Sequence, residues 1–333
     1  MAGEKQFFEG DPDPAGLILI TCGLLVPVGV RQRFTVTMRE LQLCRGMIQR
    51  EKLISNHLQS GVLYESGLCE IKNWTYDLPG RRMARGFNDC LCILYVYQGE
   101  FLFDISRQSY TMHSGYVVID KPGYEYGLRP AAGGCTIFNF ASSFYERYLD
   151  DLRLRGLFLF ANDNFCSVMM RSTAEVDYLH YQLLRQISHA GKLAVDVLAM
   201  ELFGQVVAVA TNRNEVVGDG ELPGGNQLGA IERAKDYLNE HFREDISLQD
   251  LASYCCMSPY HFLRIFKRMT AYTPHQYLLQ LRLKHGEILL KNGAAPVTEV
   301  AYESGFSSVE YFATTFRNKY GARPSQYRKL HRG

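Results

Sequence analysis

The sequence predicts an α+β protein with a β-rich N-terminal half and an all-helical C-terminal domain of two helix-turn-helix units. In 58–145, short runs of β-branched and aromatic residues are separated by turn residues about every 8–12 positions. After Ser142 the apolar residues recur at helical spacing instead. Beyond a glycine-rich stretch at 215–225, two similar helical units follow each other. A chain of 333 residues is long enough for two or three such domains.

The charge of the chain is unevenly distributed. Hydrophobic residues make up 47% and charged residues 21%, an ordinary globular composition, and the net charge is only +1. Residues 226–333 hold 15 Lys and Arg against 10 Asp and Glu, whereas the remaining residues hold 21 against 25. A basic C-terminal module therefore follows an acidic body, which points to nucleic acid as the partner of that module alone.

The cysteines and the N-terminal apolar run predict a cytoplasmic chain without metal, cofactor or membrane span. Nine cysteines are scattered, include the pair Cys255–Cys256, and show neither Cys-x-x-Cys nor zinc spacing, as expected of reduced, buried thiols. The apolar run 15–30 follows the acidic EGDPDP and is shorter than the about 20 residues of a membrane span. We leave 1–57 as an unassigned N-terminal arm, in which this run is either a buried strand or unstructured.

The region 58–145 is predicted to form a small sandwich or barrel. Cys90–Ile105 is interpreted as two strands that meet at Gln98–Gly99, and Ser109–Asp120 as a second pair that turns at Ser114–Gly115. A further turn is expected at Lys121–Gly123, and a further strand is expected at Gly134–Ala141.

The region 146–214 is predicted as a helical dimerisation segment. Apolar residues fall at helical spacing in Glu175–Ile187 and in Leu193–Val207, with Gly191 between the two helices. The second helix is apolar over a wide arc, so it can bury one side on its own domain and another on a second copy. Packing within one core is the alternative. Residues 215–225 lack apolar periodicity and are predicted as the linker to a domain at 226–333.

The first C-terminal unit has the signals of a short helix, a turn and a second helix. Ser247 is a predicted N-cap, with Asp250 three residues later. A turn through Cys256–Met257 leads to Ser258 and to Pro259, which suits the first position of a helix. The inward side chains are Phe262, Ile265 and Phe266, and the outer face holds Tyr260, His261, Leu263, Arg264 and Lys267.

The second unit repeats this pattern. Thr298 is a predicted N-cap, Gly305 makes the turn, and Ser307 or Ser308 caps the next helix. Phe312 and Phe316 face inward, and the outer face holds Val309, Glu310, Ala313, Thr314 and Arg317. Between the units lies one amphipathic helix, Pro274–Gly293, which at 1.5 Å per residue is roughly 27 Å long. A rod of that length can hold two helices about one duplex turn, near 34 Å, apart.

The segment 228–330 closely resembles the C-terminal DNA-binding domain of the AraC/XylS transcription regulators. The matching stretches are SLQDLA, MSPYHFLRIFK, TPHQYLLQLRLKHGEILL and VTEVAYESGFSSVEYFATTFRNKYGARPSQYR. The resemblance implies a sequence-specific regulator that binds double-stranded DNA, acts more often as an activator than as a repressor, and has RNA polymerase as a partner. It also implies a protein that is not an enzyme.

The resemblance further implies which side chains contact DNA. In the first recognition helix, the base-reading positions correspond to Tyr260, Leu263 and Arg264, and an arginine at a major-groove edge suits guanine. In the second helix they correspond to Val309, Glu310, Ala313 and Thr314. The outer-face residues His261, Lys267 and Arg317 complete the predicted DNA-binding set. A solvated or phosphate-facing Arg264 is the alternative.

In this family the other domain is commonly a small cupin barrel that binds an effector or pairs subunits, and Leu94–Tyr126 is similar to half of such a barrel. The segment offers only His113 where enzymatic cupins have a metal-binding set. The GRRMARG stretch places Arg81, Arg82 and Arg85 together, so they are candidate ligands for a small anionic effector such as a cyclic dinucleotide. The alternatives are an exposed basic loop, a regulator controlled by a partner protein, and a cupin enzyme with a DNA-binding tail.

Overall fold

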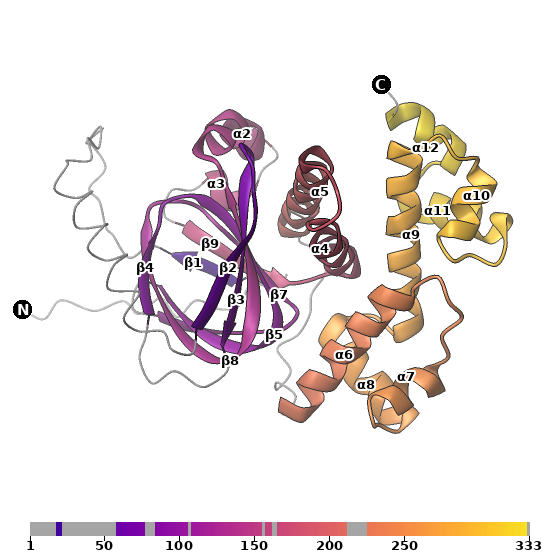
Figure 1. The fold of residues 1–333 in the computed structure, drawn as a ribbon, viewed down its shortest axis with the longest axis horizontal. Helices are drawn as coiled ribbons and strands as arrows, with labels where there is room; N and C mark the ends of the chain where they lie inside the picture. The colour runs from indigo at the N-terminus through magenta and orange to yellow at the C-terminus, as the bar shows by residue number, and fades with distance from the viewer. Residues whose placement is uncertain are drawn as a thin grey trace, which may run out of the picture.

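The structure is a computed structural model that describes residues 18–21, 58–76, 84–105, 108–154, 157–161, 165–211 and 225–331. An antiparallel β-sheet curves into a barrel-like body, and a separate helical domain lies beyond a pair of helices (Figure 1). The strands of the described chain are β1 (Ile18–Thr21), β2 (Leu58–Glu65), β3 (Cys69–Tyr76), β4 (Ala84–Asn88), β5 (Leu91–Ile105), β6 (Gln108–His113), β7 (Tyr116–Asp120), β8 (Tyr124–Phe140) and β9 (Phe165–Arg171).

These strands form one sheet in the order β1-β9-β7-β5-β8-β3-β2, with β4 paired to β8 and β6 paired to β5. The long strands β5 and β8 occupy its centre. The predicted strand at Gly134–Ala141 is therefore the second half of β8, which begins at Tyr124. Within the predicted N-terminal arm, the structure describes β1, which pairs with β9.

The prediction of two strands in Cys90–Ile105 is wrong in one respect, because the structure has a single bent strand there. The pairing of β5 with β8 shifts register between Val96 and Gln98 and again between Gly99 and Phe101. Gly99 has φ 69°, a left-handed conformation that glycine adopts without steric cost. The bend lets the first half of β5 pair with β7 and the second half with β6. The predicted turns at Gly115 and Gly123 are confirmed, with φ 88° and 108°.

Four helices of the described chain accompany the sheet: α2 (Ser142–Leu154), α3 (Phe158–Ala161), α4 (Ala174–Gln186) and α5 (Lys192–Thr211). The segment 146–214, predicted as helical, also contains β9, which pairs with β7 and β1. The helix α5 packs Val195, Leu202 and Val206 into the core that it shares with β5 and β8. By length and composition, α5 is the one helix in the described residues that could cross a membrane. Its burial against the barrel accounts for that composition.

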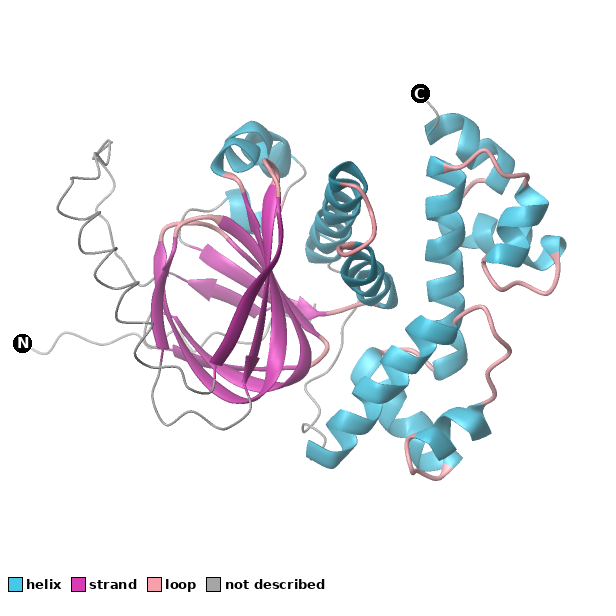
Figure 2. Cartoon of the chain, viewed as in Figure 1, coloured by secondary structure: helices cyan, strands magenta, loops and turns pink. Residues whose placement is uncertain are grey.

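The C-terminal domain holds seven helices in the described residues (Figure 2). They are α6 (Gly225–His241), α7 (Leu248–Tyr254), α8 (Pro259–Thr270), α9 (Pro274–Asn292), α10 (Val297–Glu303), α11 (Val309–Tyr320) and α12 (Pro324–His331). As predicted, α9 begins at Pro274, and Thr273 and Gln276 close a capping box on it. Most of the predicted linker lies outside the described residues, so the boundary at 215–225 stays a prediction.

The helix α4 packs against the C-terminal domain as well as against the barrel. Its Ala174 and Tyr178 belong to the same buried cluster as Leu238, Phe242 and Tyr277. The Tyr178 ring meets Phe242 edge-on at 5.7 Å between ring centroids. Its hydroxyl lies 2.5 Å from Nδ1 of His285 on α9. The two halves of the chain therefore share one packed interface in this structure.

Candidate functional site

The first helix-turn-helix unit consists of α7, a tight turn and α8. Ser247 caps α7 by accepting a hydrogen bond from the Asp250 N–H at 3.1 Å, as predicted. Cys256 in the turn has φ 56°, the left-handed conformation that costs about 1–2 kcal/mol in a residue other than glycine. Ser258 and Pro259 then begin α8. Phe262 and Phe266 are completely buried, so the opposite face of α8 is turned outward.

The second unit repeats the arrangement with α10 and α11. Gly305 takes the position of Cys256 in the turn with φ 81°, and a Cβ there would lie 2.8 Å from the Arg243 Cα. Glycine is therefore required on steric and on conformational grounds. Ser308 caps α11, as predicted. The predicted N-cap Thr298 is wrong, because α10 already begins at Val297 after Pro296, whose fixed φ favours a helix start.

On the first recognition helix, the predicted DNA-binding side chains differ in exposure. Tyr260 is 80% exposed, and Arg264 and Lys267 are exposed as well. His261 is half-buried. Leu263 is half-buried too, and it lines a hollow with Leu248 and Leu278, so part of its surface belongs to the domain itself. The cationic part of this surface is therefore Arg264 and Lys267.

The second recognition helix is less basic at its start. Glu310, Thr314 and Arg317 are exposed, and Ala313 is half-buried. Val309 packs partly against the core of Phe312 and its neighbours. If the helices are superposed on their caps Ser258 and Ser308, Glu310 takes the place of Tyr260 and Thr314 that of Arg264. The two helices therefore offer different chemistry to the same positions of a duplex.

A second candidate site is a cavity of about 310 Å³ inside the barrel. The apolar part of its wall includes Phe103, Tyr124 and Leu128. Arg85 on β4, one of the three predicted effector-binding arginines, lines this cavity, whereas Arg81 and Arg82 lie outside the described residues. Its polar lining consists of Lys72, Arg85, Asn88, Asp89, Asp120 and Asn139.

Asp120 is a buried carboxylate in this cavity that the sequence analysis did not identify. Ser167 donates a hydrogen bond to it, and the Cys92 thiol donates one at 3.4 Å. Burial raises its pKa to about 6, against the opposing effect of these donors and of the Tyr124 hydroxyl. The signal in the sequence was an acidic residue closing the apolar strand YVVID.

Asp120→Asn should stabilise the protein above about pH 6 by roughly 1–3 kcal/mol, because the asparagine requires no buried charge. The folded-state pKa is raised from 3.8 to about 6. The wild type therefore loses stability as pH rises through that window, whereas the variant does not. Denaturant titrations across this pH range should show that Asp120→Asn becomes more stable than wild type above about pH 4. The difference in unfolding free energy should become constant above about pH 6. An advantage of Asp120→Asn that stays constant across this pH range would contradict the assignment.

His113 is a buried strand residue. It lies in β6, and its Nδ1 is 2.7 Å from the carbonyl oxygen of Ser114. Burial lowers its pKa to about 4, so the ring is neutral at ordinary pH. Among the described residues, no group of three or more His, Cys, Asp or Glu side chains is arranged to bind a metal ion.

Residues 251–330 match the family model described as a helix-turn-helix domain. The HTH-type transcriptional regulator YdeC of Bacillus subtilis is 24% identical over 261 residues, which cover 73% of this chain and 85% of that protein. The transcriptional activator RhaS of Escherichia fergusonii is 25% identical over 271 residues, 76% of this chain and 90% of that protein. The chain belongs to the AraC/XylS family. It is a DNA-binding transcription regulator.

Among the solved structures that this chain is similar to is the DNA-binding domain of AdpA in complex with a target DNA. The two are 30% identical over a match that covers 31% of this chain and 93% of the AdpA domain, with a TM-score of 0.30. The two relatives above are named as regulators, in agreement with the function that the resemblance implied.

Proposed function

We propose that this AraC/XylS regulator is a cytoplasmic activator that reads a two-part DNA site, with α8 and α11 entering successive major grooves. The observation that carries the proposal is the pair of outward helix faces, each opposite a completely buried phenylalanine pair. Arg264 is the base-reading residue, suited to guanine. The contact set is Tyr260, His261, Leu263, Arg264, Lys267, Val309, Glu310, Ala313, Thr314 and Arg317.

Arg264→Ala should cost about 1–3 kcal/mol of binding free energy on the true operator and relax the preference at one base pair. Lys267→Ala should weaken binding evenly across sequences, because a phosphate contact carries no base information. A binding-site selection experiment with wild type and both variants measures this. Arg268→Ala is a matched control, since Arg268 is an exposed arginine of the same helix that lies outside the proposed contact set. Equal losses for Arg264→Ala on specific and random DNA would assign Arg264 to phosphate.

The barrel cavity supports control of this activity by a small molecule. Its volume of about 310 Å³ is at the lower end of ligand sites, which span about 300–1,000 Å³. Asp120 offers a hydrogen-bond acceptor at depth, and Arg85 offers a cation nearer the surface. A small effector with a donor group at one end and an anionic group at the other fits this arrangement better than a cyclic dinucleotide does.

Calorimetry on the full chain tests the effector proposal. The probes are hydroxy acids and amino acids as one class and cyclic-di-GMP as the other. Arg85→Gln should abolish binding of the small anions, and Arg147→Gln, an exposed arginine on α2, should leave it unchanged. Binding of neither class would favour control by a partner protein, and binding of cyclic-di-GMP alone would restore the arginine-cluster hypothesis.

We further propose a homodimer through α5, with RNA polymerase as the partner at the promoter. Leu193 is 78% exposed and Val197 is 41% exposed, and both lie one turn apart on the same face of α5. Leu193→Asp should give a monomer in sedimentation, whereas Lys192→Asp beside it should not.

A further inference from the structure

The two helix-turn-helix units have separate hydrophobic cores. In the first, Leu251, Phe262 and Phe266 pack with α6 and with the N-terminal half of α9. In the second, Val300, Phe312 and Phe316 pack with α12 and with the C-terminal half of α9. Within the C-terminal domain, α9 is the element common to both cores. The relative orientation of the two units therefore depends on this one helix unless something else braces them.

Asp177 on α4 holds the first unit. The carboxylate is 3% exposed, and its Oδ2 lies 2.7 Å from the Lys235 ammonium on α6. The hydroxyl of Tyr277 on α9 donates a hydrogen bond to the same oxygen at 2.6 Å. Tyr95 on β5 donates to Oδ1, and the Ser172 hydroxyl does so at 2.5 Å. One buried carboxylate therefore joins β5 of the barrel to α6 and α9, the two helices that pack against the first unit.

Glu175, two residues earlier on α4, holds the second unit. Lys319, in the last turn of α11, lies between the Glu175 carboxylate and the Gln280 side-chain oxygen of α9. Burial raises the pKa of Glu175, but the Lys319 ammonium outweighs this and leaves it below its usual value. The side chains of Lys319 and Glu175 are 22% and 10% exposed. This ion pair is therefore only partly screened by solvent.

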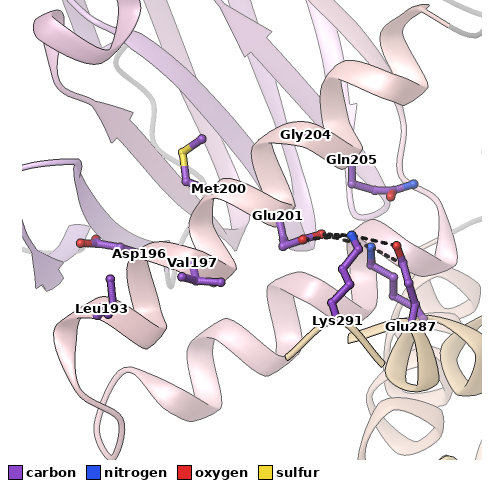
Figure 3. A pocket seen from close by; sticks show the side chains of 10 residues that line it. Leu193, Asp196, Val197, Met200, Glu201, Gly204, Gln205, Glu287 and Lys291 are labelled. Atoms are coloured by element: carbon purple, nitrogen blue, oxygen red, sulfur yellow. Dashed lines mark hydrogen bonds and ion pairs between the residues drawn. The ribbon is translucent and has the colours of Figure 1, made fainter. Parts of the chain in front are cut away.

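Glu201 on α5 holds the C-terminal half of α9, as Figure 3 shows. Its carboxylate lies 3.1 Å from the Lys291 ammonium and 3.6 Å from that of Lys284. Both lysines also pair with Glu287 at 2.9 Å, and Tyr327 of α12 donates a hydrogen bond to Glu287 at 2.7 Å. This third contact connects α5 to α9 and, through Glu287, to the second core.

We propose that α4 and α5 form a splint that braces the two helix-turn-helix units in one relative orientation, so that the N-terminal domain sets the spacing of the recognition helices. Three carboxylates on these helices hold cations from both units. This role goes beyond DNA binding, because it makes the surface of α4 and α5 that faces the C-terminal domain a regulatory one. The strand β5 places Leu94 on the barrel cavity and Tyr95 on Asp177. Displacement of this strand by a bound molecule would therefore act directly on the splint.

The test measures the distance between the two units in the full-length protein without DNA. Spin labels on p-acetylphenylalanine replace the exposed Ser253 of α7 and the exposed Glu303 of α10, and double electron–electron resonance records the distance distribution. The variants are Glu175→Gln and Lys319→Gln, which remove the same ion pair from its two sides. Lys329→Gln, at an exposed position of α12, is the matched control. Circular dichroism verifies that helix content is retained.

Wild type and Lys329→Gln should give one narrow distribution, and both splint variants should broaden it and shift its mean. A broad distribution in wild type would overturn the proposal, because the units would not be braced. A distance distribution in Glu175→Gln or Lys319→Gln as narrow as in wild type would overturn it too, because α9 alone would then fix the relative orientation of the two units. Since no DNA is present, either result is independent of which operator the protein reads.

Discussion

Phe316→Ala should destabilise the second helix-turn-helix unit by about 3–5 kcal/mol, the usual cost of truncating a buried phenylalanine. Phe316 is completely buried. Its ring lies 4.4 Å from that of Tyr320 and 5.2 Å from that of Tyr327, measured between centroids. The surrounding side chains relax only partly when a buried group is removed, so a cavity term adds to the lost apolar burial. A domain of this size has little more stability than that to lose.

Hydrogen exchange followed by mass spectrometry should show that Phe316→Ala loses amide protection in α10–α12. The first unit should keep its protection, since it has its own core. Tyr302→Ala on α10 is the control: that aromatic side chain is 59% exposed, and its removal should change stability by about 0.5 kcal/mol or less. Unchanged protection in Phe316→Ala, or equal loss in both units, would contradict the assignment of Phe316 to a separate second core.

The helix-turn-helix units could be predicted from sequence because their signals are local. A capping serine, a residue with left-handed φ in the turn and two buried aromatics one turn apart lie within a dozen positions of each other. Ser247, Ser308, Gly305, Phe312 and Phe316 all have the predicted roles. The error at Thr298 is of the same kind, because Pro296 and Thr298 are competing local signals for one helix start.

The sheet was predicted less well, since strand pairing is not local. The seven residues FCSVMMR form β9 only because β7 and β1 lie on either side of them. Their composition suits a buried helix equally. The bend of β5 at Gly99 was visible as a glycine, yet whether it ends a strand or bulges one depends on the partner β8.

The charged residues of the interface could not be predicted. Glu175 and Asp177 occupy the first turn of α4, where acidic residues are common on any exposed helix because of the helix dipole. Their cations lie far along the chain, and Lys319 is separated from Glu175 by 144 positions. The charge counts showed an acidic body and a basic C-terminal module. They did not show that carboxylates of the body pair with lysines of the module.

Asp177→Ala should destabilise the docked protein by about 3–5 kcal/mol, as expected when one partner of a buried ion pair is removed. The Lys235 ammonium, 13% exposed, would remain buried without its counter-charge. The hydroxyls of Tyr95 and Tyr277 would also lose their acceptor. Because these groups join two domains, the loss should appear first as undocking, seen as earlier proteolytic cleavage between the domains and a lower first transition in denaturant.

The pH dependence of this loss of stability distinguishes the effect of the lost ion pair from that of a shortened side chain. Burial alone would raise the pKa of Asp177, but Lys235 and the hydroxyl donors outweigh it, so the folded-state pKa lies below the usual 3.8. The carboxylate therefore stabilises the fold at pH above about 4 and loses this effect as pH falls through the lower folded-state value. Wild type and Asp177→Ala should converge in stability on acidification, whereas Asp150→Ala, an exposed position on α2, should match wild type throughout. A gap between wild type and Asp177→Ala that does not narrow at low pH would mean that lost packing, rather than the Lys235 pair, carries the effect.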